Sequence, residues 1–326
     1  MTPEASRESP APQVTTGTGE KGFPMGAKDV RDQACLHHDD ILALNFIRDG
    51  CPYVFRRHFR CGLRSHIMEV LDPEAVRLET EGVVAEGVRW YPRPVPLKML
   101  RVFRRRFCSL LEVEEEIRRL RIIETYLPRA QLAHSNEFIV HYDRGRGCDL
   151  MLCGLQEYAE GYELAPWRLP HVDVMDDLYQ RITGDGAAED SEVFSKRLRA
   201  EVARFVDGIR RMVLEAGFIP DLAGSRNMLL TRSGCLRLVD INNVSPVQRG
   251  DDIYLDDKGY PVCDKSIEAL HLMETHLLKR QVSDEDPVYG GYLGPSRREA
   301  VKRLETAFHQ QMMGTQKACR PETDAP

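Results

Sequence analysis

The chain has 326 residues, enough for one large domain or two lobes with a sizeable core. Its formal net charge of -6 argues against a dedicated nucleic-acid binder, because no overall basic excess is present to neutralise phosphates. The nine cysteines are scattered without metal-ligand spacing, and no stretch approaches the ~20 apolar residues of a membrane span. With no apolar signal core at the N-terminus, these features predict a cytoplasmic protein with reduced thiols.

Both ends of the chain are predicted to be disordered tails. Residues 1–33 are rich in Pro, Ser, Thr, Gly and Glu and offer almost nothing to bury, and residues 313–326 are similarly polar. The first apolar cluster is Ile41–Ile47. Basic residues gather in Phe55–Arg60 with Arg64, and again in Arg101–Arg106. We interpret these runs as solvated faces, with a phosphate-bearing ligand as the minor alternative.

The segment from Ala75 to Val102 is predicted to be rich in strands, and it carries one lysine inside an apolar run. Lys98 stands in Val95–Phe103, where an unpaired buried ammonium would be costly. This lysine therefore either meets a partner or ligand, or points at solvent through strand alternation. Gly82 and Gly87, upstream of it, do not match Gly-x-Gly-x-x-Gly and are typical of turns.

An amphipathic helix is predicted over 112–127, because apolar residues recur at helical spacing and the pattern ends before Pro128. Among its glutamates, Glu116 lies nearest the apolar face. If the helix presents a glutamate to Lys98, Glu116 is therefore preferred over Glu112 and Glu115. Two strands, Phe138–Tyr142 and Asp149–Gln156, are expected next, followed by a connecting segment that begins at Glu157.

The second half of the chain is predicted to be mostly helical. Strong helical spacing runs from Lys196 to Ala216, and Gly217 supplies the stop. This helix leads the chain towards Asp221. Further helices are expected over Ser266–Arg280 and Ser296–Met312.

A β-hairpin follows Asp221 and brings polar residues together. Met228–Leu230 and Cys235–Val239 are apolar runs separated by the turn Thr231–Gly234. Antiparallel pairing of these strands places Asn227, which opens the first, beside Asp240, which closes the second. An amide oxygen and a carboxylate at adjacent strand ends suit Mg²⁺.

The ordered set Asp221-Leu222, Asn227 and Asp240-Ile-Asn resembles the catalytic and metal-binding loops of the protein-kinase-like superfamily, which includes aminoglycoside and choline kinases. The resemblance spans roughly 75–243. It implies an α+β, two-lobed protein-kinase-like fold, with a small β-rich N-terminal lobe over 34–156 and a larger, mostly helical C-terminal lobe over 157–312.

The resemblance implies ATP and Mg²⁺ as cofactors. Val95-Pro-Leu-Lys98 is similar to the family's Val-Ala-Ile-Lys strand, so Lys98 would hold the α- and β-phosphates and pair with Glu116. Glu157, Tyr158 and Ala159 would form the hinge between the lobes, where backbone groups meet the adenine edge. A plain connection between a strand and a helix is an equally open interpretation of that segment.

The resemblance also implies the catalytic roles. Asn227 and Asp240 would bind Mg²⁺, and Asp221 would orient or deprotonate the acceptor hydroxyl. The sequence departs from the family pattern at Ile219-Pro220, which replace His-Arg or His-Gly, and in an interval to Asn227 that is one residue longer. No glycine follows Asp240-Ile.

Three hypotheses follow for the function. The first is an ATP-dependent phosphotransferase with a small-molecule or atypical protein acceptor, supported by the retained Lys, Asp, Asn and Asp. The second is a pseudokinase, a nucleotide-binding or scaffolding module that keeps the fold without turnover, supported by the poor glycine loop and the altered catalytic loop. The third is an unrelated α+β protein with chance motif matches.

Overall fold

The computed structural model describes residues 28–59, 64–143, 147–169, 174–183, 190–248, 250, 252–283 and 285–318, with side chains as far as residue 311. Most of both predicted tails therefore lies outside the described residues. The folded part begins earlier than the composition predicted, because the 3-10 helix η1 (Val30–Asp32) buries Val30 and Arg31. At the other end, α7 (Pro295–Ala318) continues past residue 312.

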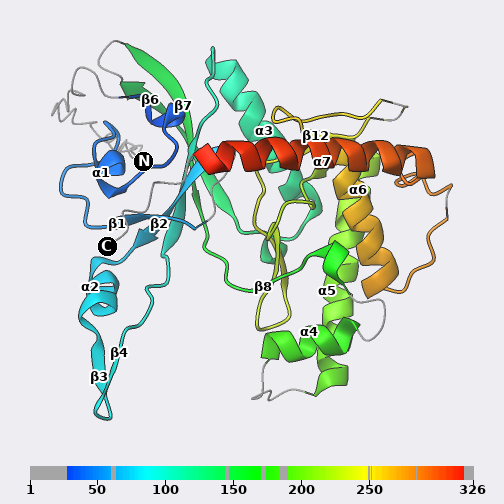
Figure 1. Cartoon of the computed structure of the whole chain (residues 1–326), viewed down its shortest axis with the longest axis horizontal. Coiled ribbons are helices and arrows are strands. Elements are labelled where there is room, and N and C mark those ends of the chain that lie inside the picture. Colours follow the sequence, from blue (N-terminus) through cyan, green and yellow to red (C-terminus); the bar gives the residue numbers. More distant parts are fainter. Residues whose placement is uncertain are drawn as a thin grey trace, which may run out of the picture.

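The chain forms a β-rich N-terminal region and a helical C-terminal region that lie side by side (Figure 1). An antiparallel sheet of order β1-β2-β5-β7-β6 builds the first. Its strands are β1 (Val54–Arg57), β2 (Ser65–Leu71), β5 (Lys98–Phe103), β6 (Ser135–Asp143) and β7 (Cys148–Gln156). The predicted α+β architecture, with a β-rich N-terminal lobe and a mostly helical C-terminal lobe, is confirmed.

The two faces of this sheet pack against different elements, because successive strand residues point to opposite sides. On one face, Leu100 and Val102 of β5 pack with Ile41 of α1 (His38–Leu42) and other residues of the N-terminal segment. On the other face, Phe103 packs with Val113 of α3 (Leu110–Tyr126). Helix α3 confirms the predicted amphipathic helix and starts earlier, where Ser109 caps it.

An appendage leaves the sheet between β2 and β5. The strand-rich prediction was wrong for its first part, which is the helix α2 (Pro73–Glu81). Asp72 caps this helix and Pro73 occupies its first turn. This helix-start signal determines the structure here, although the apolar residues that follow suggested a strand. A hairpin of β3 (Val83–Ala85) and β4 (Val88–Trp90) follows, with every residue exposed. In Figure 1 it projects away from the rest of the molecule.

The C-terminal region is organised around a long helix with a continuous buried stripe. This helix, α5, buries Phe194, Val202 and Phe205 and ends in a π-helical turn before Gly217, whose φ of 68° supplies the predicted stop. Helix α5 spans Ser191–Arg211 and its π-helical turn Met212–Ala216. The other helical elements are α4 (Val174–Thr183), α6 (Val262–Leu272) with the π-helical turn Met273–Leu277, and the 3-10 helices η2 (Arg129–Gln131) and η3 (Pro166–Arg168).

Short strands at the junction of the two regions hold the loops of the predicted site. They are β8 (Tyr162–Glu163), β9 (Phe218–Pro220), β10 (Met228–Leu230), β11 (Leu236–Leu238) and β12 (Val244–Pro246). They form the sheet β11-β10-β8 and the pair β12-β9. Within the described part of the chain, none of the helices combines the length and the apolar character that crossing a bilayer requires.

Candidate active site

The predicted hairpin forms the first part of the site. Strands β10 and β11 pair antiparallel, with Met228 opposite Leu238. The Val239 N–H donates to the Asn227 carbonyl at 2.7 Å. The chain ends that carry Asn227 and Asp240 therefore lie side by side, which confirms the predicted geometry of the hairpin.

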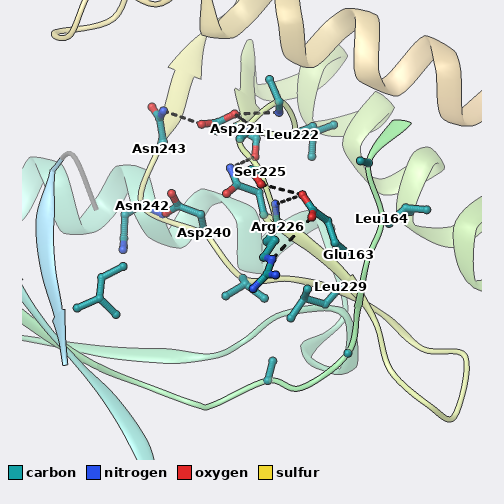
Figure 2. Close-up of a pocket in the computed structure, with 18 of the residues that line it drawn as sticks. Glu163, Leu164, Asp221, Leu222, Ser225, Arg226, Leu229, Asp240, Asn242 and Asn243 are labelled. Atoms are coloured by element: carbon teal, nitrogen blue, oxygen red, sulfur yellow. Dashed lines mark hydrogen bonds and ion pairs between the residues drawn. The ribbon is translucent and has the colours of Figure 1, made fainter. Parts of the chain in front are cut away.

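A second strand pair, which the sequence did not predict, positions the loops on either side of that hairpin. Strands β9 and β12 run antiparallel with Pro220 opposite Val244, and the Asp221 N–H donates to the Asn243 carbonyl at 2.8 Å. The loop that leaves β9 and the loop that enters β12 thus converge (Figure 2). Asn243 is a site residue that sequence reasoning missed; its signal was an amide immediately before the apolar Val244.

Asp221 is buried in the wall of a cleft, with 8% of its surface exposed. Its Oδ1 accepts the N–H groups of Ala223 at 2.9 Å and Gly224 at 3.0 Å, and its Oδ2 accepts from Asn243 Nδ2 at 3.1 Å. Burial raises the pKa of Asp221 to about 6, and the Asp240 carboxylate adds to the rise. A carboxylate with this pKa can exchange a proton near neutral pH, which suits a general base.

Asn227 is held with its amide in one orientation. Its Nδ2 donates to the Asp221 carbonyl at 3.0 Å, so its Oδ1 is the end left for a ligand. Gly224 is required beside it, because a Cβ at that position would lie 2.3 Å from Asn227 Nδ2. The backbone closes the same turn, with the Asn227 N–H donating to the Gly224 carbonyl at 3.1 Å.

Asp240 faces a buried arginine from the N-terminal sheet. Arg101 Nη2 lies 3.3 Å from Asp240 Oδ1, and Arg101 Nη1 donates to Gln156 Oε1 at 3.3 Å. In the amide orientation that hydrogen bonding requires, the Asn242 side-chain oxygen accepts from Arg101 Nε at 2.7 Å. Only 6% of the Arg101 side chain is exposed, and burial lowers the pKa of Arg101 from its ordinary value.

Lys98 does not face this cleft. Strand alternation puts Lys98 on the sheet face of Leu100 and Val102, whereas Arg101 lies on the opposite face with Met99 and lines the cleft. The apolar run alone does not reveal this register, because β5 begins at Lys98 itself and its pairing with β2 and β7 sets which residues face inwards. The prediction of a solvated basic face is therefore wrong for Arg101, which is buried in the cleft wall.

The predicted pair of Lys98 with Glu116 is not formed among the described residues. Glu116 Oε2 instead lies 2.8 Å from Arg105 Nη1. The other two candidate glutamates of α3 also have arginine partners: Glu112 contacts Arg105, and Glu115 contacts Arg118. These partners lie on or next to α3, so the helix sends none of the three glutamates to Lys98.

The cleft has a volume of about 1120 Å³ and is lined from both regions of the molecule. This is ample for a ligand of nucleotide size, since small-molecule clefts span roughly 300–1,000 Å³. The predicted hinge residues Glu157, Tyr158 and Ala159 line it, as do Asp221, Asn227 and Asp240. The Glu157 N–H donates to the His134 carbonyl at 2.8 Å, which ties this segment to the end of the sheet.

Residues on either side of the β1–β2 connection make contacts across the cleft. The Arg226 guanidinium lies over the Phe59 ring, 4.8 Å from its centroid. Arg64 Nη2 lies 3.0 Å from Asp256 Oδ2, and Arg64 Nη1 donates to Asn243 Oδ1. The glycines considered for a phosphate-covering loop do not line the cleft: Gly82 precedes β3, and Gly87 lies in the turn between β3 and β4.

Glu163 holds the loop between Asp221 and Asn227 from the opposite side. Its Oε1 accepts from Ser225 Oγ and from the Arg226 N–H, both at 2.8 Å (Figure 2). Arg226 takes a φ of 59°, an uncommon conformation for a residue with a side chain. The loop from Asp221 to Asn227 thus contains a left-handed turn at Arg226 that Glu163 of β8 stabilises.

The oxygen donors at the hairpin ends can be compared with the needs of a metal ion. Within the described residues, no group of three or more His, Cys, Asp or Glu side chains is arranged to hold one. The site offers Asp240 Oδ2 and Asn227 Oδ1, since Asp240 Oδ1 already contacts Arg101. Mg²⁺ is commonly held by one or two carboxylates together with substrate phosphates and water, so this donor set fits Mg²⁺ when a nucleotide supplies the remaining oxygens.

No family model and no curated protein matches the chain. A comparison with solved structures finds, among others, "ROP18 kinase domain in complex with AMP-PNP and sucrose", with a TM-score of 0.31 and 12% sequence identity. That match covers 80% of this chain and 83% of the other. A likeness this weak indicates nothing about the chemistry of the site.

Proposed function

We propose that the chain is a kinase-like phosphotransferase, which transfers the γ-phosphate of ATP to a hydroxyl of a small-molecule or protein acceptor. The observation that carries this proposal is Asp221, a buried carboxylate with a pKa of about 6 in the wall of a large cleft. Proton acceptance by a positioned carboxylate is the step that such a transfer requires of the protein.

Asp221 acts as the base for the acceptor hydroxyl. Its Oδ1 is occupied by the N–H groups of Ala223 and Gly224, which fix the carboxylate in place. Its Oδ2 accepts one hydrogen bond from Asn243 and retains a lone pair for the hydroxyl proton. When the acceptor oxygen attacks the γ-phosphorus, the bond to the ADP oxygen breaks and the hydroxyl proton passes to Asp221.

The nucleotide is assigned to the inner part of the cleft. Backbone groups of Glu157, Tyr158 and Ala159 would meet the adenine edge, and the phosphates would extend towards Arg101 and the hairpin. Asn227 and Asp240 would hold Mg²⁺, which neutralises phosphate charge when bound. Lys98 and Glu116 have no part in this arrangement, because neither lines the cleft.

Radiolabelled ATP tests this proposal. Purified protein with Mg²⁺ and a broad panel of hydroxyl acceptors should transfer label from the γ-phosphate, and Asp221→Asn should reduce transfer by roughly 10²-fold or more, the contribution typical of a general base. Asp177→Asn is the matched control, since Asp177 lines the same cleft and pairs with Arg181. Nucleotide binding without transfer or hydrolysis on any acceptor would contradict the proposal.

The second candidate function is a pseudokinase, a module that binds nucleotide without turnover. One observation favours it: the charge of Asp240 is already matched by Arg101. Binding of ATP that is unchanged in Asp221→Asn, with no transfer by either protein, would support this alternative. Loss of a cellular function in a folded Asp221→Asn variant that still binds nucleotide would count against it.

A further inference from the structure

The cation beside Asp240 is the guanidinium of Arg101, a group of the protein itself. Its effect on nucleotide binding is inferred here on the basis of the proposed function. Arg101 is surrounded by acceptors: Asp240 at 3.3 Å, Gln156 at 3.3 Å, Ser65 Oγ at 3.5 Å and the Asn242 oxygen. Asp240 is the one charged group among these partners. Arg101 and Asp240 therefore offset each other's charge in the cleft wall, and Glu137 adds a further negative charge near Arg101.

The arrangement disfavours a free metal ion at Asp240. A carboxylate that is already paired with a guanidinium has little net charge to offer, and the ion would also have to approach the positive Arg101. Asp240 Oδ1 is further occupied by the Asn242 N–H at 3.2 Å.

Arg101 remains able to contact an anion. Its bonds to Gln156 and Ser65, at 3.3 and 3.5 Å, are at or beyond the long end of the normal range, and the residue lines the cleft. A guanidinium has five N–H donors and is more weakly hydrated than an ammonium, so it can serve a carboxylate and a phosphate together. A phosphate oxygen can replace these two weak neutral partners.

We propose that Arg101 is a built-in cation that takes the place of a metal ion in the binding step: the cleft binds metal-free ATP almost as tightly as Mg–ATP. Any need for Mg²⁺ is then confined to turnover. The same arrangement keeps divalent cations from binding Asp240 in the absence of nucleotide. Removing the Arg101 charge creates a metal site where the native protein has none.

Two measurements on the full chain test this. Calorimetric titration with ATP is done in excess EDTA and again with Mg²⁺, and binding of Mn²⁺ alone is followed by electron paramagnetic resonance. Arg101→Met removes the charge and keeps an unbranched side chain. Arg93→Met is the matched control, because Arg93 lines the same cleft but is 71% exposed and lies 3.7 Å from Glu69.

The native protein and Arg93→Met should bind ATP with affinities that differ by less than about threefold between EDTA and Mg²⁺, a free-energy difference below ~0.7 kcal/mol. Arg101→Met should lose about tenfold or more in metal-free ATP affinity, in line with loss of a charged hydrogen bond, and Mg²⁺ should restore part of it. Arg101→Met should also bind Mn²⁺ at least about tenfold more tightly than the native protein, and adding Asp240→Asn should abolish that gain.

One result would overturn the inference and leave the proposed phosphotransferase intact. In it, chelation lowers the ATP affinity of the native protein about tenfold or more, and Arg101→Met shows the same metal dependence. If ATP binds neither in EDTA nor with Mg²⁺, both the proposed function and the proposed role of Arg101 in nucleotide binding are wrong. The Mn²⁺ comparison would still decide whether Arg101 keeps metal ions from Asp240. If Arg101→Met does not fold, Asp240→Asn is used in its place. Asp240→Asn should bind metal-free ATP at least as tightly as the native protein does, and weaker binding would overturn the inference.

Discussion

The β10–β11 and β3–β4 hairpins have strands of the same length and opposite surroundings. Leu230 and Leu238 in the first are fully buried, whereas Val84 and Val88 in the second are 60% and 54% exposed. The buried hairpin is paired with β8 on its outer edge, while β3 and β4 pair only with each other. Burial of every strand residue except Arg237 fixes the ends of the first hairpin, where Asn227 and Asp240 lie.

The largest expected effect is the loss of packing in the buried hairpin. Leu230→Ala should lower the free energy of unfolding by about 3–4 kcal/mol, because it leaves a cavity in a fully enclosed core. Chemical denaturation followed by circular dichroism measures this change. A loss below about 1 kcal/mol would mean that the hairpin is not enclosed as described.

The buried hairpin was predictable because its signals are local. Two apolar runs, a Thr231–Gly234 turn and polar residues at both ends specify the pairing without help from distant segments. The α3 and α5 helices were predictable for the same reason. The apolar repeats within each were long enough to identify them.

Arg101 was not predictable, because its direction depends on pairing over long sequence distances. Whether Lys98 or Arg101 faces the cleft is decided by the register of β5 against β2 and β7, and a shift by one residue exchanges the two faces. Asn243 was missed for a related reason, since its position requires the β9–β12 pair. The exposed appendage was misread at α2, although Asp72-Pro73 was a local signal for a helix start.

The second prediction concerns the pH dependence that the buried surroundings impose on Asp221. Its pKa is about 6 in the folded protein against an ordinary 3.8, so burial favours the protonated form. The stabilising contribution is complete below pH 3.8 and is lost as the pH rises through 6. Since Asp221→Asn cannot ionise, its stability relative to the native protein should increase across this range by roughly 3 kcal/mol.

Denaturant titrations of both proteins between pH 4 and pH 8 measure this difference. Leu230→Ala serves as the control, because removing an apolar side chain should change stability by a similar amount at each pH. A difference between Asp221→Asn and the native protein that stays constant with pH would contradict the raised pKa and, with it, the assignment of Asp221 as a base.

The third prediction concerns the outer edge of the buried hairpin. A Cβ on Gly161 would lie 2.5 Å from the Leu230 carbonyl oxygen, so Gly161→Ala must shift β8 or β10. We expect a loss of about 1–3 kcal/mol and weaker nucleotide binding, because Gly161 and the proposed hinge residues Glu157–Ala159 before it line the cleft. Gly294→Ala is the matched control, since its added Cβ meets nothing within 4 Å. Equal melting temperatures for the two variants would show that β8 can move away freely.

The smallest expected effect lies in the exposed hairpin. Val84→Ala should change the free energy of unfolding by no more than about 0.5 kcal/mol, because the side chain is 60% exposed and leaves no cavity. Val88→Ala tests the other face, on which Val83, Ala85 and Trp90 also lie. If Val88→Ala costs more than about 1 kcal/mol and the cost depends on protein concentration, this face is covered by a second copy of the chain in solution. The difference in burial between the two hairpins would then hold for the single chain but not for the dimer.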